Sequence, residues 1–113
     1  MPALQACLSE IPPKRYDYVM KRYRVIVDGI VQGVGFRYFC MYTAKECRVT
    51  GSVRNMSNGM VDIYVQGEEE NINTFLDKVK EGIGFIRVDD MRIKPVPVVE
   101  GEREFVCLYS EDW

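Results

Sequence analysis

The hydrophobic residues of this chain follow two spacings, one typical of strands and one typical of helices. Over residues 21–29, Tyr23, Val25 and Val27 lie on one face and Ile26 on the other, which predicts a strand. Further along, apolar or small residues recur at i, i+4, i+7, i+8 and i+11. This spacing predicts one face of an amphipathic helix of about twelve residues. The members of that face are Phe36, Cys40, Thr43, Ala44 and Cys47.

The middle of the chain predicts a β-hairpin. Two strands are expected, at residues 49–56 and 60–66. In the second, the β-branched residues at 61, 63 and 65 alternate with Met60, Asp62 and Tyr64. Asn58 and Gly59 separate the two strands, and both residue types tolerate the positive φ angles that a tight hairpin turn requires. Gly67 is expected to end the second strand.

A second helix and two further strands follow the hairpin. The acidic residues 68–70 complement the dipole at a helix start, and Gly82 is a suitable stop. Strands are expected at residues 85–94 and 104–109, with prolines between them. The order β-α-β-β-α-β predicts an α+β, ferredoxin-like split β-α-β sandwich, with an antiparallel sheet, two helices on one face and a short extra C-terminal strand. The apolar face of the second helix comprises Ile72, Phe75, Leu76 and Val79.

Composition is consistent with a single globular domain. The chain has 113 residues, 47% of them hydrophobic and 28% charged, and a formal net charge of −2. We expect residues 1–20 to be a poorly ordered extension and residues 21–113 to form the domain. The near balance of acidic and basic residues argues against a nucleic-acid partner. No apolar run approaches the roughly 20 residues needed to span a bilayer, so no membrane partner is expected.

The titratable residues limit the chemistry that is open to the chain. There is no histidine, and the four cysteines form no Cys-x-x-Cys pair, which argues against a structural zinc site. On one helix, Cys40 and Cys47 would be about 10 Å apart along the axis, which is too far for a disulfide. Free thiols indicate a reducing, cytoplasmic location. Without histidine, an enzyme of this sequence is expected to catalyse a reaction that needs little proton transfer.

The stretch from Gly29 to Arg37 is the first candidate site. Three glycines precede the predicted helix, and glycines allow main-chain N–H groups to form a concave cluster beside the positive end of the helix dipole. A cation in the first turn of a helix is mildly unfavourable. Arg37 is therefore better explained if an anion, such as a phosphoryl group, binds beside it.

The second candidate is Asn55, at the end of the predicted strand 49–56. The hairpin turn is already provided by Asn58 and Gly59, so Asn55 is not needed for it. A carboxamide offers both a donor and an acceptor, which suits the orientation of a water molecule. Taken alone, an asparagine at this position more often makes its hydrogen bonds within the hairpin.

Together the two stretches closely resemble the signatures of the acylphosphatase family, over about residues 21–109. The first signature is Val31-Gln32-Gly33-Val34-Gly35-Phe36-Arg37, and the second is Gly51-x-Val53-Arg54-Asn55-x-x-x-Gly59-x-Val61, followed by Gly67. One position departs from the family pattern, because Ser52 stands where an aromatic residue is usual.

The resemblance implies a metal-independent hydrolase that converts small acyl phosphates and water into a carboxylate and inorganic phosphate. Arg37 and Asn55 would be the catalytic residues, with Asn55 orienting the water. The phosphate cradle would comprise Gln32, Gly33, Val34, Gly35, Phe36 and Arg37. No cofactor is implied, and we expect a monomer.

Three alternatives remain open at this stage. An RNA-recognition module shares the order of elements, but residues 59–65 carry a single aromatic residue and an aspartate where such a module needs several aromatics. A catalytically silent anion-binding domain would keep the same loop. A preference for carbamoyl phosphate is a third option, because acylphosphatase-like domains also occur in larger carbamoyl-transfer proteins; a chain of 113 residues is not expected to hold their other domains.

Overall fold

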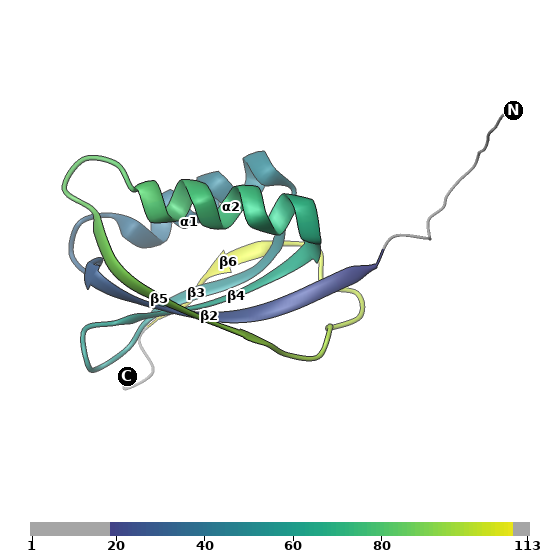
Figure 1. Ribbon diagram of the computed structural model, residues 1–113. Helices are drawn as coiled ribbons and strands as arrows, with labels where there is room; N and C mark the ends of the chain where they lie inside the picture. The colour runs from purple at the N-terminus through teal and green to yellow at the C-terminus, as the bar shows by residue number, and fades with distance from the viewer. Residues whose placement is uncertain (1–18, 110–113) are drawn as a thin grey trace, which may run out of the picture.

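The computed structural model describes residues 19–109 of the chain. Figure 1 shows two helices on one side of a twisted sheet, which confirms the α+β, ferredoxin-like arrangement. Most of the predicted extension, residues 1–18, and the last four residues lie outside the described residues. The elements are β2 (Met20–Ile30), α1 (Phe36–Cys47), β3 (Thr50–Asn55), β4 (Val61–Glu68), α2 (Glu69–Glu81), β5 (Arg87–Pro95) and β6 (Phe105–Cys107).

The sheet has the strand order β5-β2-β4-β3-β6. The pairs β2–β4, β2–β5 and β3–β4 are antiparallel, and β4 therefore separates β2 from β3. The extra C-terminal strand β6 lies parallel to β3, with Val53 opposite Cys107, so the complete sheet is mixed. β5 ends at the same end of the sheet at which β6 begins, so β6 runs antiparallel to β5. Because β5 is itself antiparallel to β3, β6 lies parallel to β3.

The predicted strand ends differ from the structure by one or two residues, and two of these differences have a structural explanation. Gly67 does not end its strand: it pairs with Lys21, and β4 continues to Glu68. A Cβ atom at Gly67 would lie 3.1 Å from Cγ1 of Val49, so this glycine allows close packing rather than a stop. The last strand is shorter than residues 104–109, although the N–H of Leu108 still donates to the Val53 oxygen over 2.8 Å.

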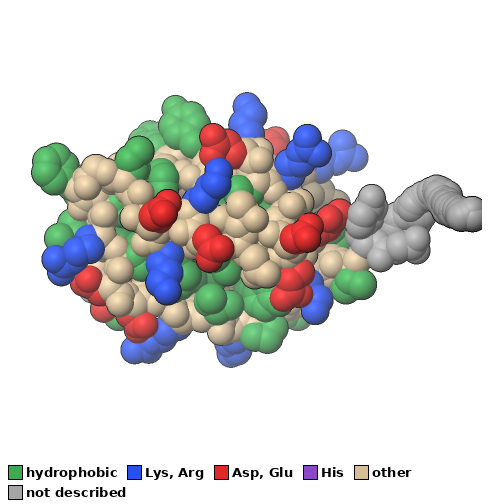
Figure 2. Space-filling view, turned by 45° about the horizontal axis from the view of Figure 1, so that its top comes forward, with side chains coloured by type: hydrophobic (Ala, Val, Ile, Leu, Met, Phe, Trp, Pro, Cys, Tyr) green, Lys and Arg blue, Asp and Glu red, His purple; other side chains and the backbone are tan. Residues whose placement is uncertain are grey.

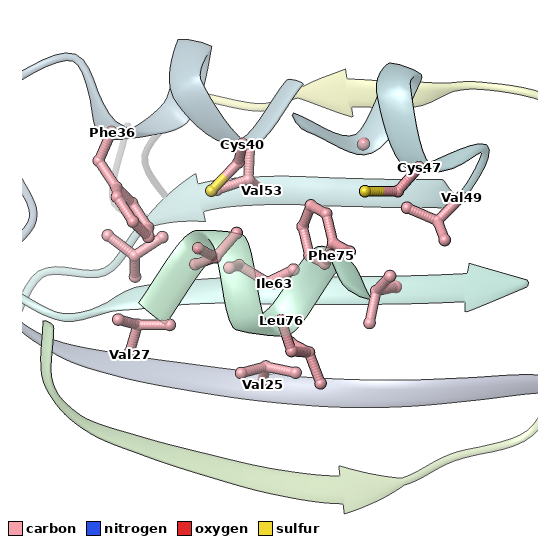
Figure 3. Close-up of a cluster of buried hydrophobic side chains, with 14 of the residues drawn as sticks. Val25, Val27, Phe36, Cys40, Cys47, Val49, Val53, Ile63, Phe75 and Leu76 are labelled. Carbon is pink, nitrogen blue, oxygen red and sulfur yellow. The ribbon is translucent and has the colours of Figure 1, made fainter. Parts of the chain in front are cut away.

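The core fills the space between the helices and the sheet, as Figure 3 shows. All five residues of the predicted α1 face are buried, as are the four of the α2 face. Phe36 and Phe75 are fully buried side chains contributed by the two helices. Burial of a large apolar side chain stabilises a fold by roughly 1.5–3 kcal/mol, so these residues fix both helices on the sheet.

Gly51 is needed where β3 passes β4. Its φ of 140° is unfavourable for other residues, and a Cβ atom there would overlap the main-chain oxygen of Tyr64. The glycine in the second signature is therefore explained by the close pairing of two strands. It holds β3 in register with β4, and β3 carries Asn55 at its end.

The sheet face away from the helices is polar. Asp62 is fully buried there and accepts two hydrogen bonds from Arg24, at 3.0 and 3.1 Å, and a third from Arg54. Gln66 bonds both main-chain groups of Val99, which fixes the crossing from β5 to β6.

On the helical side, Figure 2 shows acidic and basic side chains interspersed rather than separated. Neither helix of the described residues is long and apolar enough to cross a membrane.

Candidate active site

The connection between β2 and α1 leaves main-chain donors open. Gly33 and Gly35 have φ angles of 76° and 79°, in the left-handed region that favours glycine. Gly35 is the N-cap of α1, so no side chain caps the helix, and its first turn contains no acidic residue. The first N–H groups of a helix have no partner within the helix, and they carry its positive partial charge. The loop therefore presents donors that suit an anion.

Gln32 connects this loop to the β3–β4 hairpin. Its side-chain amide donates to the main-chain oxygens of Met56 and Met60, each over 2.8 Å. Met56 directly follows Asn55, and Gly33 directly follows Gln32. The two bonds thus hold the glycine loop beside the end of β3, although β4 lies between β2 and β3 in the sheet.

Arg37 lies in the first turn of α1 and is half-buried. Its Nη1 donates over 2.9 Å to the main-chain oxygen of Leu108, just after β6. A guanidinium group has five N–H donors in a planar fork. One bond to Leu108 orients the fork and leaves donors that can bind phosphoryl oxygens in a bidentate manner.

Asn55 contributes an acceptor without a partner. Its Oδ1 atom is buried and accepts no hydrogen bond from the described residues. A buried polar atom left unpaired costs about 1–3 kcal/mol, so such an atom calls for an explanation. A water molecule or a substrate group that donates to Oδ1 would supply the missing bond.

A pocket of about 140 Å³ joins these groups. Of the predicted site residues, Gly33, Gly35, Phe36, Arg37 and Asn55 line it, whereas Gln32 and Val34 do not. Gln32 uses its side chain in the hairpin bonds, and Val34 is partly buried against the core. Arg37 is the charged residue of this lining, and none of the described residues that form it is acidic. The pocket is thus electropositive and too small for more than a group of about phosphate size.

Three contributors to the site were not among the predicted site residues. Val31, a buried residue of the first signature, lines the pocket, but a buried valine is the usual sign of a core position. Tyr38 lines the pocket, but nothing in its type or position distinguishes it from other exposed aromatic residues. The Leu108 oxygen orients Arg37, and a main-chain oxygen has no sequence signal because every residue carries one.

The neighbouring thiol is a poor nucleophile. Cys40 is fully buried one helical turn after Phe36, and Figure 3 shows it beside Val53. Burial raises the pKa of the Cys40 thiol, and the proximity of Cys107 raises it further. The thiol therefore stays protonated at neutral pH, and the groups that face the pocket remain the candidates for catalysis.

Comparison with known proteins assigns the family. The acylphosphatase family model matches residues 23–107. An acylphosphatase of Clostridium beijerinckii is 47% identical over 90 residues, which are 80% of this chain and all of that protein. An acylphosphatase of Bacillus subtilis is 41% identical over 91 residues, again 80% of this chain and all of that protein.

Solved structures agree with this assignment. The crystal structure of the Bacillus subtilis acylphosphatase superposes with a TM-score of 0.75 at 38% identity, and covers 80% of this chain and all of that one. Full-length HypF, in a phosphate- and nucleotide-bound form, matches with a TM-score of 0.73 at 30% identity over 83% of this chain but only 13% of its own length. The chain belongs to the acylphosphatase family.

The geometry predicts that Gln32→Glu lowers turnover without unfolding the protein. A carboxylate cannot donate to the oxygens of Met56 and Met60, so the loop and the hairpin lose their connection. A displacement of about 1 Å at reacting groups can reduce a rate by about 100-fold. The loss should appear mainly in kcat, measured with acetyl phosphate. Wild-type kcat in the folded variant would contradict this role of Gln32.

Proposed function

We propose that the chain hydrolyses the carboxyl-phosphate bond of small acyl phosphates, at the pocket between Gly33 and Asn55. One observation carries the proposal. Arg37, the residues at the start of α1 and Asn55 line a single electropositive pocket, and the buried Oδ1 atom of Asn55 has no hydrogen-bond partner among the described residues. Membership of the acylphosphatase family supports the same reaction.

Binding of the phosphoryl group is assigned to the loop and to Arg37. The N–H groups of residues 33–37 and the helix dipole attract the phosphoryl oxygens. Arg37 grips two of these oxygens through its planar fork, while its bond to Leu108 keeps the fork in place. Phosphoryl transfer through a loose transition state depends mostly on positioning and charge stabilisation, which this arrangement supplies.

Asn55 is assigned to the attacking water. The water donates one hydrogen to Oδ1, which directs its oxygen lone pair at phosphorus. The new bond joins the water oxygen to phosphorus, and the bond from phosphorus to the acyl oxygen breaks. The electron pair stays on the leaving carboxylate, and the proton of the water passes to solvent.

The chemistry of the leaving group explains why the proposed hydrolysis needs only a few catalytic side chains. A carboxylic acid has a pKa near 4, so its carboxylate leaves without a general acid. An alkoxide would need a proton donor, and the chain has no histidine to serve as one. Acyl phosphates therefore fit this site better than phosphate esters do. Comparison of acetyl phosphate with carbamoyl phosphate would establish which small acyl group is preferred.

The cellular location and the oligomeric state of the enzyme are further parts of the proposal. We expect a reducing, cytoplasmic location, because Cys40, Cys47 and Cys107 are free thiols among the described residues. We also expect a monomer.

Removal of the side chain of Arg37 or of Asn55 should abolish most of the hydrolytic activity. Arg37→Ala removes the phosphoryl fork and Asn55→Ala removes the water acceptor, and loss of one preorganised group typically costs about 10²–10³-fold in rate. Phosphate release from acetyl phosphate measures the effect, with circular dichroism as the check on folding. Arg92→Ala and Asn73→Ala are matched controls, because both residues are exposed and lie outside the pocket. Near-wild-type turnover in folded Arg37→Ala or Asn55→Ala would refute the assignment.

Chelation should leave activity unchanged. The proposed mechanism places the positive charge on Arg37 and on main-chain N–H groups, so it needs no divalent cation. Turnover of acetyl phosphate is measured after dialysis against EDTA, with and without added Mg²⁺. A loss of activity that Mg²⁺ restores would overturn the metal-independent mechanism.

A further inference from the structure

The catalytic pocket leaves the acyl part of a substrate unaccounted for. Its volume of about 140 Å³ is below the roughly 300–1,000 Å³ of typical small-molecule sites. If a phosphoryl group and a water fill it, as the proposed function requires, the rest of the substrate must lie outside. Tyr38, at the rim, is 62% exposed and marks where that part would emerge.

A groove of about 740 Å³ begins at the same residue. Tyr38 lines both the catalytic pocket and this groove, which runs between α1 and the chain that leads into β6. One wall is the stripe of Tyr38, Met41, Tyr42 and Lys45, spaced i, i+3, i+4 and i+7 along α1. The opposite wall includes Phe105. Because Tyr38 lines both the groove and the catalytic pocket, the two adjoin at this residue.

The groove changes character along its length. Its start is aromatic and apolar, with Tyr38 and Met41 on α1. Further on it carries Lys45, Arg48 and Arg103, against a single acidic residue, Glu104. The three cations are exposed and make no ion pair with another described residue. A ligand that follows the groove would therefore meet an apolar surface first and positive charge afterwards.

We propose that this groove binds the acyl part of the substrate, and that the preferred acid carries a second carboxylate at its far end. The seven residues from Tyr38 to Lys45 correspond to about 10 Å along the helix axis, a span suited to an extended dicarboxylic acid. The chain of the acid packs against the aromatic start of the groove. Its distal carboxylate pairs with Lys45 and Arg103. This inference rests on the proposed function and deepens it.

Three substrates test the inference with the whole protein. Suberoyl monophosphate has an eight-carbon chain with a distal carboxylate, octanoyl phosphate has the same length without it, and acetyl phosphate does not reach the groove. The wild-type kcat/KM should be about tenfold higher for suberoyl monophosphate than for octanoyl phosphate, as expected for one added charge-assisted contact. An equal kcat/KM for both would overturn the inference.

Removal of the cations should erase that preference. In the double variant Lys45→Gln/Arg103→Gln, kcat/KM for suberoyl monophosphate should fall to the kcat/KM for octanoyl phosphate. Turnover of acetyl phosphate should be unchanged, because neither residue lines the catalytic pocket. Lys80→Gln/Arg92→Gln removes two exposed cations outside the groove and should keep the preference. A preference that survives in the first variant, or is lost equally in the second, contradicts the groove. If the wild type does not hydrolyse acetyl phosphate, the proposed function itself fails.

Discussion

The two hydrogen bonds of the Gln32 amide are the constraint on which the candidate site depends. Arg37 follows β2 and Asn55 ends β3, and these strands are separated by β4. By donating to Met56 and Met60, Gln32 makes the glycine loop and the hairpin one unit. The proposed reaction needs a phosphoryl group and a water in fixed relative positions, and this connection would hold them there.

Around the Gln32 bonds, some groups of the candidate site supply positive charge and others hold those groups in position. The main chain at the start of α1 and the Arg37 fork supply positive charge, while Leu108 and Gln32 keep the parts in place. The reaction proposed for this site makes small demands, because its leaving group is already a weak base. The groove beyond Tyr38 would then act on affinity and selectivity, separately from the chemistry in the pocket.

Much of this architecture could be predicted from residue patterns. The spacing of Phe36, Cys40 and Cys47 predicts the buried face of α1, because a helix repeats every 3.6 residues. The parallel pairing of β6 could not be predicted, since it depends on how the chain crosses the sheet. For the site, the signatures identify Arg37 and Asn55 as candidates, but spacing does not say what a side chain contacts. Gln32 is predicted in the phosphate cradle, and its spacing gives no sign that its side-chain amide bonds the hairpin.

A crystal structure of the protein with inorganic phosphate, the proposed product, tests the central claim most directly. The account predicts one phosphate in the pocket, bound by the N–H groups of residues 33–37 and by Arg37. A water beside it should donate to Oδ1 of Asn55, so that this buried atom gains its missing partner. A phosphate bound elsewhere, or an Asn55 that contacts neither phosphate nor water, would contradict the account.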